Sequence, residues 1–505
     1  MDVEDREIRL TKKLRLAVGI CLIETLVTMQ YSVIITAAND IVADKAPTGL
    51  VLFAYSIPSI LTRIIVPLVR FPDSSNFPIA SLFRSSRSGD AIDNSTSLTK
   101  EINYPLRLIV CAASSAIGLQ LLAHSSNIGV LILGIMLAAL SSNLGDMSLQ
   151  MLCARYPNSS KSAFGGYTAG SGFSASLGAF SYTYATSRMG LKYTNAFSIY
   201  GIAPLIALLV YAFLLPEPEG AVATAAEEEQ EGIVRLPWKD KLRIIRPMFV
   251  PYMLPLATIF FVENSITQGI FPTLLYYVPI KDGSFFLSRF FHGVFHETRD
   301  FYPLYLTVNQ LSSFAGRFSF WLFRLPGGST RSTRAYWALV YIETFALILQ
   351  LANSLSMQTS PLPEQPESSV LYGPMGVISL AGVQGLAAGM VFCNTYWKIL
   401  QKPLPSAVYD ALDDSRARIG LQERRARADS EEEAMGLLTL SDDAPKSERE
   451  YSSSEETALR EFLLSTIAPP DVVSVAVASI VGMALQKSLC DWQSFHGREL
   501  CVRTR

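Results

Sequence analysis

A glutamate lies inside an apolar stretch of the chain that is otherwise suited to lipid. Residues 259–277 read IFFVENSITQGIFPTLLYY. At 100° per residue, Glu263, Asn264, Thr267 and Gln268 fall within one arc of about 140° on a helix. A charged side chain at bilayer depth costs roughly 2.5 to 3.5 kcal/mol on insertion scales, so Glu263 has to face protein or water. We therefore predict that Glu263, Asn264 and Gln268 line a pathway for a solute or a proton.

Other apolar segments carry polar residues at helical spacing. One face of the first segment is polar from Glu24 to Asp40. Two interpretations stay open for each such residue: a solute pathway, or a buried ion pair or interhelical hydrogen bond that holds the helices together. Arg317, like Glu263, lies too far from a helix end to reach the membrane surface by extending its side chain. The further candidates are Asp40, Arg63, Asp146, Arg317 and Gln384.

The composition indicates a membrane protein with many spans. Of 505 residues, 50% are hydrophobic and 17% are charged, which is too apolar for an ordinary soluble protein. No basic face is left once the apolar segments are removed, so we expect no binding to nucleic acid. The N-terminal segment lacks a small-residue cleavage site and is expected to be a retained first span.

We expect an all-α fold with about eleven transmembrane helices, each long enough to cross a hydrocarbon core of about 30 Å. The expected spans are 14–38, 49–69, 105–123, 128–152, 164–185, 194–215, 248–271, 301–323, 335–355, 370–399 and a last one within 458–489. They divide the chain into a first bundle (1–215), a cytosolic linker (216–247), a second bundle (248–399), a disordered cytosolic loop (400–457) and a last span with its tail (458–505).

The loops give orientation and a candidate sorting signal. Lys and Arg gather in alternate loops and near the N-terminus, which predicts a cytosolic N-terminus. In the 400–457 loop, Glu433 precedes Leu437 and Leu438 by the spacing of an acidic dileucine signal, which a sorting adaptor would bind. A solvated linker in which the pattern arises by chance is the alternative.

Small residues and prolines predict how helices pack. Gly166, Gly170, Ser174 and Gly178 recur every four residues, which allows close approach of a neighbouring helix. Pro469-Pro470 should break the last span at membrane depth, and broken helices in membranes line cavities.

No enzyme or metal site is expected. The segment 143–146 lacks the first glycine of the intramembrane aspartyl protease pattern GxGD. His292 and His296 have no evident third ligand, and the six scattered cysteines are expected to be packing residues. We therefore predict no metal and no cofactor.

Five segments, in order, resemble the signature blocks of the battenin (Batten-disease protein) family, its fungal vacuolar members in particular. They are TAANDI (36–41), LSSNLGDMSL (140–149), GGYTAGSGFSASLGAFSY (165–182), FFVENSITQGIF (260–271) and VQGLAAGMVFCNTYWKI (383–399). The resemblance implies a divergent, two-bundle relative of the major facilitator superfamily. It places Glu263, Arg317 and Asn394 at a glutamate, an arginine and an asparagine of the family. Asn39 and Gln384 depart from it, because many relatives have His and Glu there, and Asp146 stands where many have Glu.

The resemblance also implies a function. The family resides in vacuolar or lysosomal membranes and is tied to vacuolar transport, vacuolar pH homeostasis, handling of basic amino acids (arginine) and, in animals, export of glycerophosphodiesters. The implied partners are membrane lipid, a small-molecule solute, protons and sorting adaptors. A second function class stays open: a non-transporting regulator of vesicle traffic or of the vacuolar proton pump, which acts through its cytosolic loops.

Overall fold

The fold is described by a computed structural model of the chain. It describes residues 3–37, 41, 49–65, 104–216, 237–276, 301–322, 329–356, 373–400, 404–427, 453–467 and 469–498. Within these ranges the secondary structure is helical and contains no strand. The predicted all-α class is confirmed.

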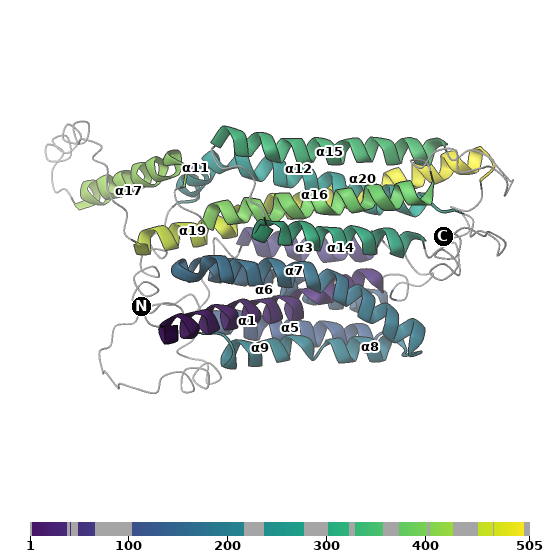
Figure 1. Cartoon of the computed structure of the whole chain (residues 1–505), viewed down its shortest axis with the longest axis horizontal. Coiled ribbons are helices and arrows are strands. Elements are labelled where there is room, and N and C mark those ends of the chain that lie inside the picture. Colours follow the sequence, from purple (N-terminus) through teal and green to yellow (C-terminus); the bar gives the residue numbers. More distant parts are fainter. Residues whose placement is uncertain are drawn as a thin grey trace.

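Two bundles of helices lie side by side (Figure 1). The first contains α1 (Val3–Thr36), α3 (Gly49–Ile65), α5 (Tyr104–His124), α6 (Ile128–Ala154), α7 (Ser160–Thr183), α8 (Tyr193–Tyr200) and α9 (Ala203–Phe213). The second contains α11 (Trp238–Met248), α12 (Leu254–Ser265), α14 (Phe301–Leu322), α15 (Ser329–Ser356), α16 (Pro374–Leu400), α19 (Ser453–Ile467) and α20 (Pro469–Phe495). The predicted two-bundle architecture is confirmed.

The bundles meet along three helix pairs: α7 with α14, α3 with α20, and α6 with α19. One apolar cluster belongs to the first bundle and includes Val33 and Leu119, while another belongs to the second and includes Ile266 and Tyr305. The largest cluster joins both, because it runs from α1 through α6 and α16 to α19. Apolar packing therefore closes the contact between the bundles at the end where α19 lies.

Two of the helices that face the other bundle, α7 and α14, are less apolar than a typical membrane span. Eight helical stretches of the described residues are long and apolar enough to cross a membrane, and α3 is apolar but shorter. The helices α7 and α14 stand where the fifth and eighth spans are predicted but are not among the eight. Since they pack against each other between the bundles, their small and polar residues need not face lipid.

Glycines set the distance between paired helices, as the sequence predicts. A Cβ atom on Gly170 of α7 would lie 2.5 Å from the carbonyl oxygen of Cys21 in α1. Gly385 and Gly389 of α16 lie in the same way against the backbone of α14. Any larger side chain at these positions would push the helices apart.

The last span is described as two helices, α19 up to Ile467 and α20 from Pro469. Ala468 between them lies outside the described residues, so the predicted break at Pro469-Pro470 stays a prediction. The seventh span contains π-helical turns at Phe249–Met253 and Ile266–Ile270 on either side of α12. Such turns are frequent at functional sites.

Two expectations from the sequence are wrong. Residues 406–427 of the segment expected to be disordered form helix α17 (Ser406–Arg427), because Val408 and Leu412 bury their side chains in the largest apolar cluster. Cys490 is disulfide-bonded and therefore does more than pack.

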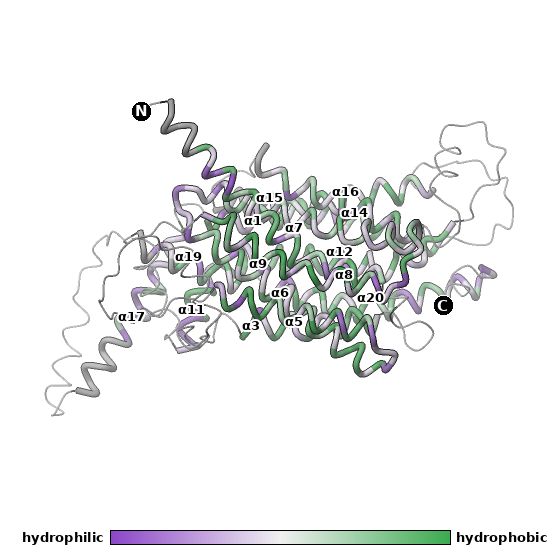
Figure 2. Tube along the Cα trace, turned by 90° about the horizontal axis from the view of Figure 1, so that it is seen from below, coloured by the Kyte–Doolittle hydropathy of each residue, from purple (hydrophilic) through white to green (hydrophobic). Residues whose placement is uncertain are grey.

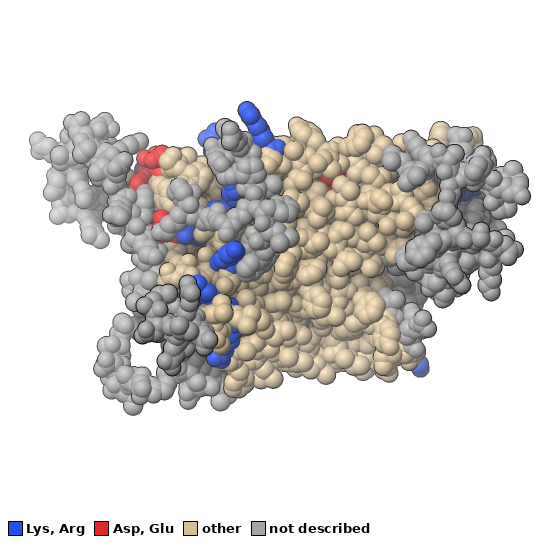
Figure 3. Space-filling view, in the orientation of Figure 1, with Lys and Arg blue, Asp and Glu red and all other residues tan. Residues whose placement is uncertain are grey.

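The two ends of the molecule differ in charge. Figure 2 shows hydrophobic residues along the middle of the helices and hydrophilic ones toward the ends. Lys and Arg gather at the end where α11, α17 and α19 lie, and few appear at the opposite end in this view (Figure 3). The helix α1 begins at the basic end, whereas α20 ends at the other.

Candidate functional site

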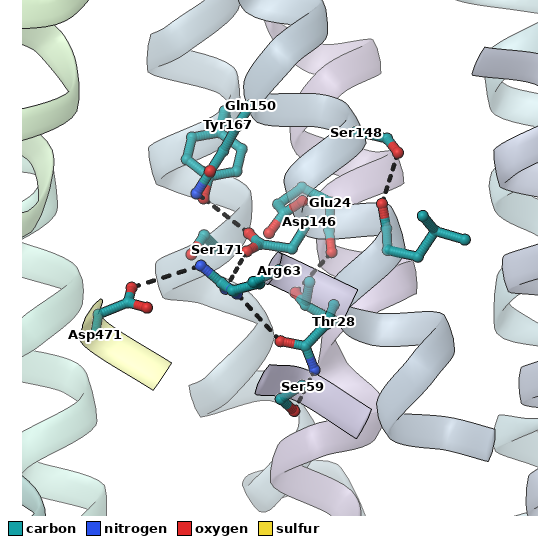
Figure 4. Close-up of polar contacts among 12 residues, drawn as sticks. Glu24, Thr28, Ser59, Arg63, Asp146, Ser148, Gln150, Tyr167, Ser171 and Asp471 are labelled. Carbon is teal, nitrogen blue, oxygen red and sulfur yellow. Dashed lines mark hydrogen bonds and ion pairs between the residues drawn. The ribbon is translucent and has the colours of Figure 1, made fainter. Parts of the chain in front are cut away.

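A buried arginine joins the two bundles. Arg63 lies in the last turn of α3, and its Nη2 is 2.6 Å from Oδ2 of Asp146 on α6. Its Nη1 is 3.5 Å from Oδ2 of Asp471 on α20 (Figure 4). The three side chains are between 8% and 11% exposed. One cation is thus shared by an acid of its own bundle and an acid of the other.

The first of these acids is held in place from several sides. The hydroxyl of Tyr167 on α7 donates to Oδ1 of Asp146 at 2.7 Å, and Gln150 donates in turn to Tyr167. Asn143 accepts from Nε of Arg63 at 3.3 Å and donates to Ser59. This ring of hydrogen bonds orients the ion pair between α3, α6 and α7, as a buried charge requires.

The second acid follows a double proline. Asp471 stands in the first turn of α20, directly after Pro469-Pro470. Its side chain is buried and lies within ion-pair distance of Arg63. The start of α20 therefore supplies the acid of the second bundle at this interface.

Glu263 and Arg317 form a second polar group on the other side of the interface. Glu263 of α12 is 7% exposed, and it interacts with the side chain of Asn309 on α14 by a hydrogen bond and with Arg317 electrostatically. The guanidinium of Arg317 lies 4.6 Å from the ring centre of Phe392 and donates to Ser171 of α7 in the first bundle. Arg317, like Arg63, reaches across the interface.

The polar group around Arg63 and the one around Arg317 interact electrostatically. The charges of both Arg63 and Arg317 act on Glu24 of α1, and Arg317 also acts on Asp471. Glu24, Asp146, Glu263 and Asp471 thus face two arginines. Such an excess of acids at membrane depth is balanced by a bound proton or by a cation.

Three other predicted site residues make hydrogen bonds to groups outside this centre. Asn264 and Asn394 each donate to a carbonyl oxygen of their own helix at 2.9 Å. Gln384 accepts from Gln350 of α15 at 3.4 Å, an interhelical hydrogen bond within the second bundle. For Gln384 this is the contact expected if it only holds the bundle together.

The remaining predicted residues lie at the margin of the site or outside the described ranges. Gln268 stands in the π-helical turn, against Gly482 of α20. Asp40 and the candidate sorting signal Glu433, Leu437 and Leu438 lie outside the described residues. Within the described ranges, no three His, Cys, Asp or Glu side chains are placed to hold a metal ion.

Three buried acids were left out of the final set of site candidates named from the sequence: Glu24, Asp471 and Glu343. Glu24 lies on the polar face of the first span, and Asp471 follows the double proline, so both had a signal in the sequence. Glu343 of α15 is fully buried and interacts electrostatically with Glu263. It lies alone in an apolar segment, where a single residue does not distinguish a pathway from packing.

Comparison with known proteins gives a family. The model of the CLN3 protein family matches residues 91–235 and 220–492. Protein BTN1 of Mycosarcoma maydis is 25% identical over 94% of this chain and 86% of that protein. Protein btn1 of Schizosaccharomyces pombe is 24% identical over 99% of this chain and 100% of that protein. The resemblance to the battenin family is confirmed.

Solved structures show only distant similarity. The human organic anion transporter MFSD10 (TETRAN) aligns with a TM-score of 0.45 and 12% identity, over 98% of each chain. A D-xylose-proton symporter aligns with a TM-score of 0.44 and 12% identity, over 96% of this chain and 98% of that chain.

Proposed function

We propose that the chain, which belongs to the CLN3 protein family, is a transporter of the vacuolar or lysosomal membrane that moves a small solute between its two bundles. In this proposal it contributes to vacuolar transport and vacuolar pH homeostasis. The supporting observation is the position of Arg63, which pairs with Asp146 of one bundle and Asp471 of the other. A charge shared in this way lets the bundles separate only if another partner replaces one of the acids.

The site chemistry suits the solutes that the family resemblance implies. An ammonium or guanidinium group, as in arginine, is recognised by carboxylates such as Glu263 and Asp146. A phosphodiester is recognised by arginines, and Arg63 and Arg317 supply two. Both arginines reach from one bundle to the other, so a solute that replaces one of these contacts would favour rocking of the bundles around the site.

The orientation follows from charge. Lys and Arg gather at the end of the molecule that contains the start of α1, and the positive-inside rule assigns such an end to the cytosol. The N-terminus is then cytosolic and α20 ends in the lumen. Sorting adaptors would reach the 400–457 segment from the cytosol, since α17 lies at the same end.

The test is transport by purified protein in sealed vesicles. Radiolabelled arginine and glycerophosphocholine are offered under an imposed pH gradient to wild type, Glu263→Gln and Arg63→Gln. We expect uptake by wild type that depends on the gradient, with at least a tenfold loss in both variants. The exposed substitution Asp414→Asn on α17 is the control and should leave uptake unchanged. Folded, correctly oriented wild type that moves neither solute contradicts the proposal.

A regulator of vesicle traffic or of the proton pump is the second candidate, and one observation favours it. The helix α17 packs against α11 with the apolar cluster behind it, so the segment presents an ordered surface. Asp410 and Asp414 are exposed on that surface. Reversing both charges to Lys should leave vesicle uptake intact if the chain is a transporter. If it is a regulator, the same variant should lose its effect in cells while it reaches the right membrane.

A further inference from the structure

A carboxyl group in the first bundle has no role in the ion pairs described above. Glu24 of α1 is 0% exposed. It lies where α7 closely approaches α1, because a Cβ atom on Gly170 would be 2.8 Å from Cβ of Glu24. Figure 4 shows its side chain beside Asp146 and near Tyr167. The close contact of α1 with α7 leaves this side chain no route to solvent along that face.

Neither oxygen of Glu24 accepts a hydrogen bond from a donor group of the described residues, and the side chain within hydrogen-bonding reach is another carboxyl, that of Asp146. An ionised carboxylate in such a place has lost its hydration and received nothing in return. A protonated carboxyl is neutral and tolerates the same surroundings far better. Burial and the lack of a hydrogen-bond donor therefore both favour a proton on Glu24.

The groups that surround Glu24 also favour a proton on it. Asp146 lies beside it, and its own carboxylate pairs with Arg63 and accepts a hydrogen bond from Tyr167. Two carboxylates side by side in a dry site repel each other, so one of them holds a proton. Among the described residues, the titratable groups that interact with Glu24 include Cys21 of α1, Asp146 and Cys153 of α6, Tyr167 of α7, Arg63 of α3 and Arg317 of α14.

We propose that Glu24 is a proton-binding site and that its protonation state sets where Arg63 pairs. While Glu24 holds a proton, Arg63 bridges Asp146 and Asp471 and so ties the bundles together, which is the arrangement in this structure. Loss of the proton leaves two carboxylates in the first bundle, and their combined charge draws Arg63 away from Asp471. The step is a simple dissociation: the O–H bond of Glu24 breaks, the electron pair stays on the carboxylate and the proton leaves to water.

This inference rests on the proposed transport function for its biological meaning, but not for its test. The first measurement is infrared difference spectroscopy of the full-length protein in lipid nanodiscs while the pH is raised. A protonated buried carboxyl gives a carbonyl stretch that ionised carboxylates lack. We expect wild type to lose such a band on deprotonation, Glu24→Gln to lack that component at every pH, and Glu24→Asp to show it at a shifted frequency.

Glu343→Gln is the matched control, because Glu343 is also fully buried and has no hydrogen-bond partner among the described residues. This variant should keep the component assigned to Glu24. If Glu24→Gln and wild type give the same difference spectrum, Glu24 does not hold the proton. If Glu24→Gln fails to fold, Glu24→Asp decides the question through the frequency shift, and an unshifted band overturns the proposal.

The second measurement separates proton binding from transport. In sealed vesicles, Glu24→Gln should exchange arginine or glycerophosphocholine at equal pH on both sides, within twofold of wild type. It should lose at least tenfold of the accumulation driven by a pH gradient. Accumulation as in wild type refutes coupling through Glu24. If wild type moves neither solute, the transport proposal fails, while the infrared band still decides whether Glu24 binds the proton.

Discussion

The ion pair between Arg155 and Glu461 should be a main source of stability at the basic end of the molecule. Glu461 of α19 is 0% exposed in its side chain, and its two carboxylate oxygens lie 3.3 and 3.4 Å from Nε of Arg155, the residue that follows α6. The hydroxyl of Tyr104 on α5 donates to the same carboxylate. One acid of the second bundle is thus held by two helices of the first.

The expected cost of removing it follows from burial. Breaking a buried pair leaves an uncompensated charge and costs about 3–5 kcal/mol. The charges of Arg107 and Arg155 also repel each other. Glu461→Ala therefore leaves two neighbouring cations without their acid, and we expect a loss in the upper half of that range. Glu461→Gln keeps the shape and an acceptor for Tyr104, and should cost about 1–3 kcal/mol.

A double-mutant cycle measures the pair itself. The free energy of unfolding is followed by denaturant titration in micelles for wild type, Glu461→Ala, Arg155→Ala and the double variant. Because the double variant leaves no unpaired charge at this pair, we expect a coupling energy of about 2–3 kcal/mol. Strictly additive losses, or a change below about 0.5 kcal/mol in Glu461→Ala, would show that the pair does not hold the bundles together.

Three further outcomes are expected. Gly170→Val should destabilise the fold by about 1–3 kcal/mol, because the new side chain collides with the backbone of α1. Gly373→Ala should not destabilise the fold, because nothing lies within 4 Å of the new Cβ atom. Size-exclusion profiles of the two variants test this difference. Arg317→Lys keeps the charge but loses the planar stacking on an aromatic ring, so uptake in vesicles should fall although the protein folds. Asp240→Asn should change the free energy of unfolding by less than about 1 kcal/mol, because its partners Arg243 and Arg418 are 50% and 45% exposed; a larger loss would mean that these pairs support α11 and α17 more than their exposure indicates.

Much of the fold was predictable because it depends on local rules. A run of apolar residues long enough to cross a bilayer has to be a helix, since lipid cannot satisfy an open backbone. Helix α17 was not predicted, because its charged surface resembles a solvated linker. It is ordered only by the contacts that its few apolar residues make with the core.

The candidate site was predictable only in part. That Glu263, Arg63 and Asp146 face protein follows from the cost of a charge in lipid, and the structure buries all three. Asn264 and Asn394 share helical faces with functional candidates, yet each bonds to its own backbone. An amide has that choice at any position of a helix, so spacing does not reveal which one it takes.

The sequence by itself determined that the chain is a helical membrane protein of many spans and that charges lie within its bundles. Each of these results depends on neighbours a few residues away. Only the tertiary structure decided that Arg63 pairs with Asp146 and Asp471 and that the carboxyl group of Glu24 lies beside that of Asp146. The residues that meet are far apart in the chain, and packing of whole helices, rather than any periodicity along one of them, brings them together.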